Sequence, residues 1–197
     1  AGGWPVLSTP SEDGLSLSAG GIDIRQALTD SAVIGSEFFG IHIQNGAPAD
    51  ATQALPIDLG QKAIRLWDTR TTWRLLEPSK GSYDWSRLDY LVDLYTAQGY
   101  QILYTMGQAP AWATGGVAGG ALGGSTTIYN STPPDNDQDW INHCTAVATR
   151  YRGRIHAYEP WNEPLTTKYW SGSVADIGRL TILASQAIKA ADPDALI

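Results

Sequence analysis

The residues best suited to chemistry lie close together in one segment, His156-Ala157-Tyr158-Glu159-Pro160-Trp161-Asn162-Glu163-Pro164. Carboxyl groups can give and take protons, an amide can bind a hydroxyl group, and an indole offers a flat apolar face with one N–H donor. The segment lies at the C-terminal end of a short run, Ile155 to Trp161, of the kind that forms a β-strand. It is therefore the first place to look for a functional site.

Alternation along a strand decides which of these side chains can act together. Glu159, Trp161 and Glu163 are spaced by two, so they share one face if the strand continues without a bulge. A carboxylate on a buried face needs a partner, and Arg65, in an earlier apolar run, is the best candidate. The alternative for Arg65 is a solvent-facing surface position, and for Glu163 an exposed cap or loop position.

The aromatic composition suggests a ligand class. The chain has 8 Trp and 9 Tyr but only 2 Phe, which favours rings that combine a flat face with a polar group. Such rings stack on the apolar face of a sugar. Trp67, Trp112 and Trp161 sit at or just beyond the ends of strand-like runs and are the candidates for this contact, although core packing explains at least one of them. His42 is equally compatible with ligand contact and with a hydrogen-bonded core role.

The overall composition excludes several classes of partner. A net charge of −7 argues against nucleic acid and anionic membranes, both of which favour basic surfaces. A single cysteine, Cys144, allows no internal disulfide, and no paired-histidine motif predicts a metal site. We expect no cofactor. The low lysine content and the sequon Asn130-Ser131-Thr132 suggest a secreted or periplasmic protein.

Two regions differ in their pattern. Residues 1–36 are rich in Ser, Gly and Pro and predict a loosely structured lead-in compatible with a short hairpin. From residue 37 to 197, strand-like runs alternate with longer segments. The runs are Phe38 to Gln44, Ala63 to Asp68, Gln101 to Met106 and Ile155 to Trp161, and Ala195-Leu196-Ile197 opens a fifth.

Helical periodicity fills the segments between the later runs. The three predicted helices carry the stripes Leu88, Leu91, Val92, Tyr95; Trp140, Cys144, Val147, Tyr151; and Ile177, Leu180, Ala184, Ala187, Ile188. Gly99 is placed to cap the first, Ser173 with Asp176 to start the third, and Asp192-Pro193 to end it. The connection between the first two runs contains Pro48, Pro56 and Gly60, so its helix must be short. The Gly-rich stretch from Gly115 to Ser125 predicts a mobile loop over a cleft.

Strict alternation of strands and helices predicts a parallel α/β sheet. A doubly wound open sheet is the rival, but no Gly-rich fingerprint follows the first strand. Polar and aromatic residues at several strand ends favour a (β/α)₈ barrel, whose sites lie at that face.

The segment around Glu163 resembles the retaining (β/α)₈ glycoside hydrolases of the 4/7 clan. Trp161-Asn162-Glu163-Pro164 at the end of strand four is similar to the clan's acid/base motif, and the chain looks most like glycoside hydrolase family 39, including its exopolysaccharide-degrading members. Supporting stretches are Arg65-Leu66-Trp67-Asp68, Gly81-Ser82-Tyr83-Asp84-Trp85 and Tyr104-Thr105-Met106-Gly107-Gln108-Ala109-Pro110-Ala111-Trp112-Ala113. Pro160 departs from the pattern, and its missing donor is typical of a bulge.

The resemblance implies roles for individual residues. Glu163 would be the catalytic acid/base, Asn162 would bind the sugar 2-hydroxyl, and Arg65 would orient the nucleophile. His42, Trp67, Asp68, Trp112 and Trp161 complete the expected substrate-binding set. The acid must keep its proton near neutral pH, which requires partial burial or a nearby second carboxylate, and we expect the position beside Trp161 and between two prolines to provide such a site for Glu163.

The resemblance also implies that the catalytic machinery is divided. The family's nucleophile is a glutamate at the end of strand seven, whereas this chain reaches only the start of strand five. Residues 37–197 therefore match the N-terminal half of a catalytic domain of about 250 residues. We expect a second fragment or chain that supplies the C-terminal half. The functional alternative is a non-catalytic carbohydrate-binding protein on the same scaffold.

Overall fold

The computed structural model describes residues 18–19, 22–23, 35–42, 60–116 and 131–197. The chain divides into two units, Ala1–Ile34 and Gly35–Ile197. In the first, β1 (Ser18–Ala19) and β2 (Ile22–Asp23) pair antiparallel, which matches the short hairpin expected there. The predictions for Pro48, Pro56 and most of the Gly-rich loop fall outside the described residues.

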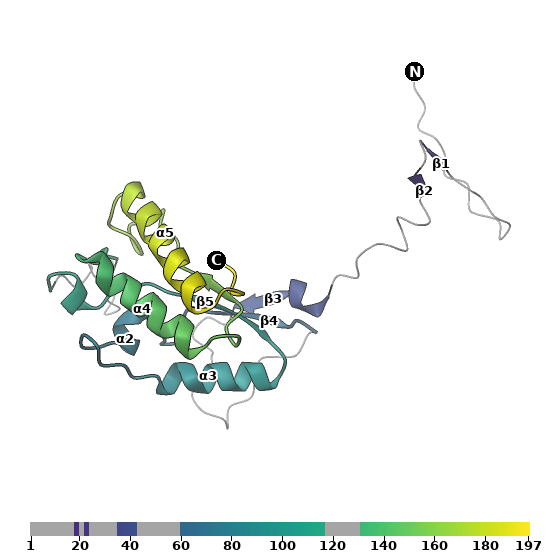
Figure 1. Cartoon of the computed structure of the whole chain (residues 1–197), viewed down its shortest axis with the longest axis horizontal. Coiled ribbons are helices and arrows are strands. Elements are labelled where there is room, and N and C mark those ends of the chain that lie inside the picture. The colour runs from purple at the N-terminus through teal and green to yellow at the C-terminus, as the bar shows by residue number, and fades with distance from the viewer. Residues whose placement is uncertain (1–17, 20–21, 24–34, 43–59, 117–130) are drawn as a thin grey trace, which may run out of the picture. The chain divides into compact units, whose positions relative to one another are not determined.

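The second unit contains a parallel sheet. Its described strands are β3 (Gly40–His42), β4 (Ala63–Leu66), β5 (Gln101–Thr105) and β6 (Ala157–Glu159), in the order β3-β4-β5-β6. Each lies inside a predicted run, and the parallel pairing confirms the predicted topology (Figure 1). Leu196 continues the sheet as a parallel bridge to Ala157, with the Tyr158 N–H donating to the Leu196 carbonyl at 2.9 Å. The predicted opening of a fifth strand is thus confirmed.

The helices form where the apolar stripes predicted them. They are α3 (Ser86–Ala97), α4 (Asp137–Arg150) and α5 (Val174–Ala191), accompanied by the short α2 (Trp73–Leu76) and the 3₁₀ turns η1 (Ser36–Phe38) and η2 (Ala111–Ala113). Gly99 adopts a φ of 73° just after α3, and Ser173 and Asp176 form a reciprocal capping box at the start of α5. Asp192 is the residue at which α5 ends.

The two faces of the sheet have different surroundings. Leu66, Tyr104 and Tyr158 lie side by side across the strands and are fully buried beneath the helices. On the opposite face, Arg65, Leu103 and Ala157 are only partly buried. A hollow of 270 Å³ on β3, β4 and β5 is lined by Gly40, Ile41, His42, Ala63, Ile64, Arg65 and Leu103. The described residues thus leave one sheet face open.

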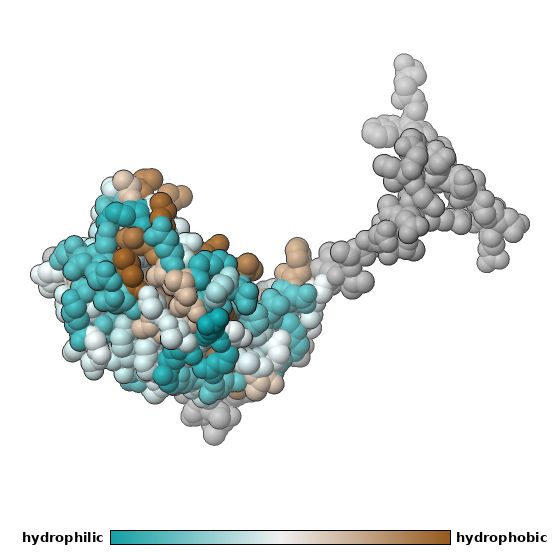
Figure 2. Space-filling model, in the orientation of Figure 1, coloured by the Kyte–Doolittle hydropathy of each residue, from teal (hydrophilic) through white to brown (hydrophobic). Residues whose placement is uncertain are grey.

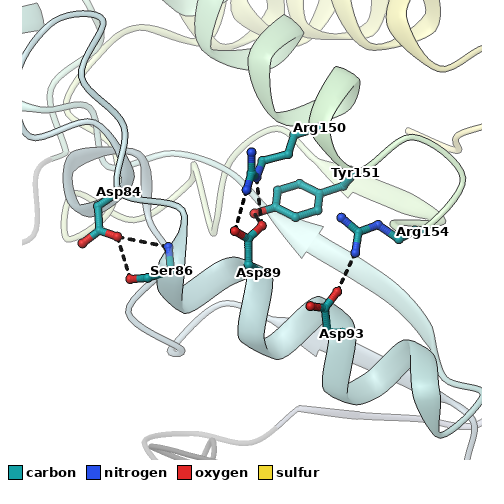
Figure 3. A network of polar contacts seen from close by, with 7 residues as sticks. All are labelled: Asp84, Ser86, Asp89, Asp93, Arg150, Tyr151 and Arg154. Carbon is teal, nitrogen blue, oxygen red and sulfur yellow. Dashed lines mark hydrogen bonds and ion pairs between the residues drawn. The ribbon is translucent and has the colours of Figure 1, made fainter.

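Polar contacts join α3 to α4 on the outside of the helix layer (Figure 3). The Asp89 carboxylate accepts hydrogen bonds from Arg150 Nε at 2.8 Å and from the Tyr151 hydroxyl at 2.9 Å. Arg154 pairs with Asp93 at 2.6 Å. Exposed pairs contribute little individually, typically about 0–1 kcal/mol each. None of these residues takes part in the hydrogen bonds of Arg65 or Glu159.

The surface viewed in Figure 2 is mostly hydrophilic, with apolar residues gathered over α5. Exposed apolar side chains on that helix include Val174, 81% exposed, and Ile182, 58% exposed. Within the described residues, no helix combines the length and the apolar content needed to cross a bilayer.

Candidate active site

A polar cluster occupies the carboxyl ends of β4, β5 and β6 on the open face of the sheet. Arg65 lies at its centre and donates from Nε and Nη2 to Glu159 Oε2, at 2.8 and 2.6 Å. The same Nη2 donates to Asn162 Oδ1 at 2.7 Å. Thr105 adds its hydroxyl, which donates to Glu159 Oε2 at 2.6 Å. Three neighbouring strands thus contribute to one hydrogen-bond network.

The strand register explains this arrangement. Arg65 lies beside Leu103, and Thr105 lies beside Glu159, so side chains spaced by two along each strand meet on one face. The predicted pairing of Arg65 with Glu159 is confirmed. The alignment of Trp161 and Glu163 with Glu159 is expected only if the strand continues, and that condition is not met, because β6 ends at Glu159, directly before Pro160.

Asn162 is held in one orientation. The residue is only 2% exposed, and its side-chain oxygen accepts a hydrogen bond from Arg65. Among the described residues, its Nδ2 group is buried without a hydrogen-bond partner. Leaving such a donor unsatisfied typically costs about 1–3 kcal/mol. The arrangement therefore offers a fixed N–H donor that a ligand oxygen would satisfy.

Glu163 follows Asn162 and is exposed. The expectation of partial burial beside Trp161 is not met within this chain, because the Trp161 ring turns into the helix layer. Glu163 adopts a φ of 42°, and the non-glycine residues Arg70 and Gln108, beyond β4 and β5, have φ values of 63° and 55°. Such backbone conformations are uncommon for residues with a side chain and gather at functional sites. All three follow the carboxyl ends of successive strands.

His42 and Asp68 form a second polar pair at this end of the sheet. His42 Nε2 lies 3.6 Å from Asp68 Oδ2. His42 is beside Arg65 in the register of β3 and β4, and both side chains of the pair are partly exposed. The two predicted substrate-binding residues are thus near Arg65 and open to solvent.

Two of the candidate stacking residues are core residues in this structure. Trp67 and Trp161 are each 4% exposed. The Trp161 ring packs against Trp140 and Trp170, with centroid distances of 6.0 and 4.9 Å, and its Nε1 donates to the Tyr169 carbonyl at 2.7 Å. Trp67 meets the edge of the Tyr169 ring at 6.0 Å. Their burial does not support sugar stacking, and that role stays a prediction.

Trp112 is partly exposed but belongs to a different cluster. Its Nε1 donates to the Glu77 carbonyl at 2.8 Å, its ring meets Trp73 at 5.9 Å, and the Lys80 ammonium lies 5.8 Å from the ring centroid. The structure therefore does not bring Trp112 into the Arg65 network.

The core beneath Trp112 contains buried ionisable groups. Glu77 accepts from Trp73 Nε1 at 2.7 Å and from the Gly81 N–H at 2.8 Å. Burial lowers the pKa of His143 to about 3, so its ring is neutral at pH 7 and its 3.9 Å approach to Glu77 is not an ion pair. Burial and the nearby Glu77 raise the pKa of Tyr83. His143 lies on α4, in the helix layer.

Two residues of the site were not singled out from the sequence. Thr105 lies within a predicted strand, and its two-residue spacing from Leu103 could have placed it on the Arg65 face. Tyr169, which covers Trp67 and Trp161, lies in an irregular loop and had no signal. Among the described residues, no group of three or more His, Cys, Asp or Glu side chains could hold a metal ion.

Comparisons with known proteins give independent support. A glycoside hydrolase family 42 model, described as beta-galactosidase, matches residues 59–116. The endo-1,4-beta-xylanase A of Phanerodontia chrysosporium is 25% identical over 170 residues, which cover 82% of this chain and 38% of the xylanase.

Solved structures share the fold. A family 39 glycoside hydrolase from Bacteroides cellulosilyticus WH2 superposes with a TM-score of 0.51 at 24% identity, covering 69% of this chain and 25% of that one. Endo-glycoceramidase II from Rhodococcus sp. gives 0.52 at 21% identity, covering 70% and 41%. Xylanase 10B from Thermotoga maritima gives 0.52 at 16% identity, covering 80% and 47%.

These matches agree on one architecture and divide among several families. The chain spans less than half the length of each of these proteins. The family-model match, the xylanase relative and the shared fold confirm the predicted architecture. The chain is thus related to the glycoside hydrolases and has the fold of the N-terminal half of a (β/α)₈ barrel.

Proposed function

We propose that this chain carries the acid/base half of a retaining O-glycoside hydrolase that acts on an oligo- or polysaccharide. The observation that carries the proposal is the fixed amide of Asn162, buried and with an unpartnered Nδ2, directly before Glu163 at the end of β6. The order Asn-Glu-Pro at this strand end matches the resemblance, and the relatives that the chain matches are named as glycosidases.

The proposed reaction uses Glu163 twice. In the first step its carboxyl group donates a proton to the glycosidic oxygen while a carboxylate attacks the anomeric carbon, forming a covalent glycosyl-enzyme. In the second step Glu163 accepts a proton from the water that hydrolyses this intermediate. Asn162 Nδ2 would donate to the sugar 2-hydroxyl, a contact that strengthens in the transition state.

The nucleophile would come from a second polypeptide segment. Retention requires two carboxyl groups about 5 to 5.5 Å apart, and Glu159, the carboxylate of the described network, is already bound by Arg65 and Thr105. The open sheet face and the exposed Glu163 are what a missing C-terminal half would cover. That half would also desolvate Glu163, which raises the pKa of a carboxyl group and keeps it protonated.

The deciding experiment replaces Glu163 in the complete protein. We expect Glu163→Gln to lower kcat/KM for an aryl glycoside with a poor leaving group by about 10²- to 10⁴-fold, the usual contribution of general acid catalysis. A 2,4-dinitrophenyl glycoside needs no protonation, so formation of the glycosyl-enzyme from it should be much less affected. Sugar binding, followed by calorimetry, should remain. Glu37→Gln, which alters an exposed carboxylate on η1, is the matched control, and an unchanged rate in Glu163→Gln would rule out the assignment.

The exposure of Glu163 favours one alternative, a non-catalytic carbohydrate-binding protein. It predicts that the complete protein binds oligosaccharides, that Glu163→Gln leaves binding unchanged, and that neither the unaltered protein nor Glu163→Gln hydrolyses them.

We also propose that the protein works outside the cytoplasm, where it would encounter polysaccharides. Fractionation of the source cells checks this, and recovery in the cytoplasm alone would contradict it.

A further inference from the structure

Glu159 lies at the centre of the polar cluster but is not the proposed acid. Three donors converge on one of its oxygens: Arg65 Nε at 2.8 Å, Arg65 Nη2 at 2.6 Å and the Thr105 hydroxyl at 2.6 Å, all to Oε2. The carboxylate side chain is 34% exposed and that of Arg65 is 23% exposed. Glu159 therefore holds the guanidinium in place from the floor of the cluster.

The orientation of the guanidinium fixes the orientation of the amide. Arg65 Nη2 is shared between Glu159 Oε2 and Asn162 Oδ1, at 2.6 and 2.7 Å. An arginine side chain has donors and no acceptor. Asn162 must therefore turn its oxygen toward Arg65, which turns its NH₂ group away, since the flipped amide would place two donors against each other.

We propose that Glu159 is a positioning residue that acts through Arg65 to fix the Asn162 amide, so that Nδ2 is presented to the substrate. This inference rests on the proposed function for the identity of the group that Nδ2 meets, the sugar 2-hydroxyl. Glu159 itself touches neither the substrate nor the proton that is transferred. Its effect on the reaction is confined to the contact that Asn162 makes.

Thr105 supports the same arrangement from β5. It is 1% exposed, and its hydroxyl donates to the oxygen of Glu159 that also accepts from Arg65. Thr105→Val keeps the shape of the side chain and removes this donor. The variant should therefore have the same effect as a change at Glu159, but a smaller one, because the two Arg65 bonds remain.

Comparing the effect of one variant on two substrates, with and without the 2-hydroxyl group, separates a positioning role from a general loss of structure. We expect Glu159→Gln in the complete protein to lower kcat/KM for an aryl glycoside by about 10- to 100-fold, the range for loss of hydrogen bonds to charged groups. On the matching 2-deoxy glycoside, which lacks the hydroxyl that Asn162 would bind, the loss should be less than about threefold. Equal losses on both substrates would overturn the proposal.

Asp89→Asn is the matched control. Asp89 also accepts from both Nε and Nη2 of an arginine, Arg150, and from the Tyr151 hydroxyl (Figure 3). The chemical change is the same, but it lies on the helix layer between α3 and α4. Asp89→Asn should leave unchanged the ratio of kcat/KM for the aryl glycoside to kcat/KM for its 2-deoxy analogue. A changed ratio would show that this comparison responds to a general loss of structure and not to the position of Asn162.

A second readout does not depend on catalysis. The side-chain NH₂ resonances of Asn162, assigned by their loss in Asn162→Asp, should move and exchange faster with water in Glu159→Gln than in the unaltered protein. If they move while no variant hydrolyses any glycoside, the proposed function fails and the positioning role stands. If they do not move, the positioning role fails whatever the activity.

Discussion

The side chains beyond β4, β5 and β6 fall into two groups by their surroundings. Arg65 and Asn162 are fixed by hydrogen bonds within one network, which leaves Asn162 Nδ2 without a partner among the described residues, whereas Glu163 is exposed on a backbone with positive φ. A side chain in a closed network keeps its geometry without a ligand. The described residues therefore define the binding contacts of the proposed site, while the surroundings of Glu163 depend on what covers the open sheet face.

Sequence reasoning predicted the site where side chains follow strand alternation. It identified Arg65 as the partner of Glu159 because both point to one face of adjoining strands. It failed at Trp161, because Pro160 ends the strand and the next ring turns toward α4. It also missed the loop residue Tyr169, whose contacts with Trp67 and Trp161 depend on an irregular backbone that no periodicity reveals.

Gly107 is expected to be hard to replace. Its φ is 114°, and a Cβ there would lie 3.0 Å from Trp161 Cδ2. Gly107→Ala should destabilise the complete protein by about 2–3 kcal/mol through strain and displacement of the ring, measured by urea unfolding. Gly99→Ala is the control, since its φ is 73° and nothing lies within 4 Å of the added carbon; it should cost about 1 kcal/mol. Equal losses of unfolding free energy in the two variants would mean that the Trp161 ring moves aside without destabilising the fold.

His143 should make the fold sensitive to acid. Its folded-state pKa is about 3, well below the value of about 6.5 for an unfolded chain. The unfolded state therefore binds a proton first, and stability falls as the pH drops from about 6.5 toward 3, by up to about 1.4 kcal/mol per pH unit.

The variant His143→Phe tests this effect. It keeps an aromatic ring between Trp73 and Tyr83, which stack on His143 at 4.8 and 6.2 Å, and removes the titrating group. Urea unfolding between pH 4 and 7 should show a shallower dependence on pH than in the unaltered protein. The exposed His156→Gln serves for comparison, and identical slopes in the unaltered protein and His143→Phe would contradict the assignment.

At the scale of the elements, the long helices were the most predictable part of the fold. The stripes Leu88 to Tyr95 and Trp140 to Tyr151 predicted α3 and α4 because core burial repeats with the helical period. The short helix α2 had no such signal, since Trp73–Leu76 spans a single turn. The predicted runs around β4, β5 and β6 extend beyond the ends of these strands, because apolar character alone does not mark where strand pairing stops.

The start of α5 offers a test at this scale. The Ser173 side chain accepts from the Asp176 N–H at 3.1 Å, and the Asp176 carboxylate accepts from the Ser173 N–H at 3.0 Å. Ser173→Ala should destabilise the protein by about 1 kcal/mol, seen as a lower urea midpoint. Ser185→Ala, within α5, should be neutral or slightly stabilising because alanine has the higher helix propensity. A loss of the same size in both variants would show that the cap is not the cause.

At the scale of the whole molecule, the sheet is covered on one face only by the residues described. Alternating strands and helices predicted the parallel order β3-β4-β5-β6, and the comparisons agree with it. What alternation alone does not reveal is the tertiary closure of the sheet, because that depends on side chains from strands five to eight.

The open face leads to a prediction about the isolated chain. Alone, this polypeptide should aggregate or unfold without cooperativity, because Leu103 and its neighbours on the open face stay in contact with water and, among the described residues, no strand pairs with the outer edge of β3. Co-expression with the proposed C-terminal half should yield a soluble complex of both. Gel filtration with circular dichroism distinguishes the two states, and a stable, cooperatively unfolding monomer of this chain would contradict the division into halves.

The hollow above β3 and β4 constrains the size of the side chains on any strands that close the barrel. Gly40 and Ala63 are adjacent in the register and contribute almost no side-chain volume to the 270 Å³ space beside them. Because a barrel interior is packed as densely as any protein core, large aliphatic or aromatic residues must enter this space from the opposite wall. Strands that close such a barrel would thus be recognisable, in whatever sequence carries them, by bulky inward positions opposite Gly40 and Ala63, before any catalytic glutamate is sought.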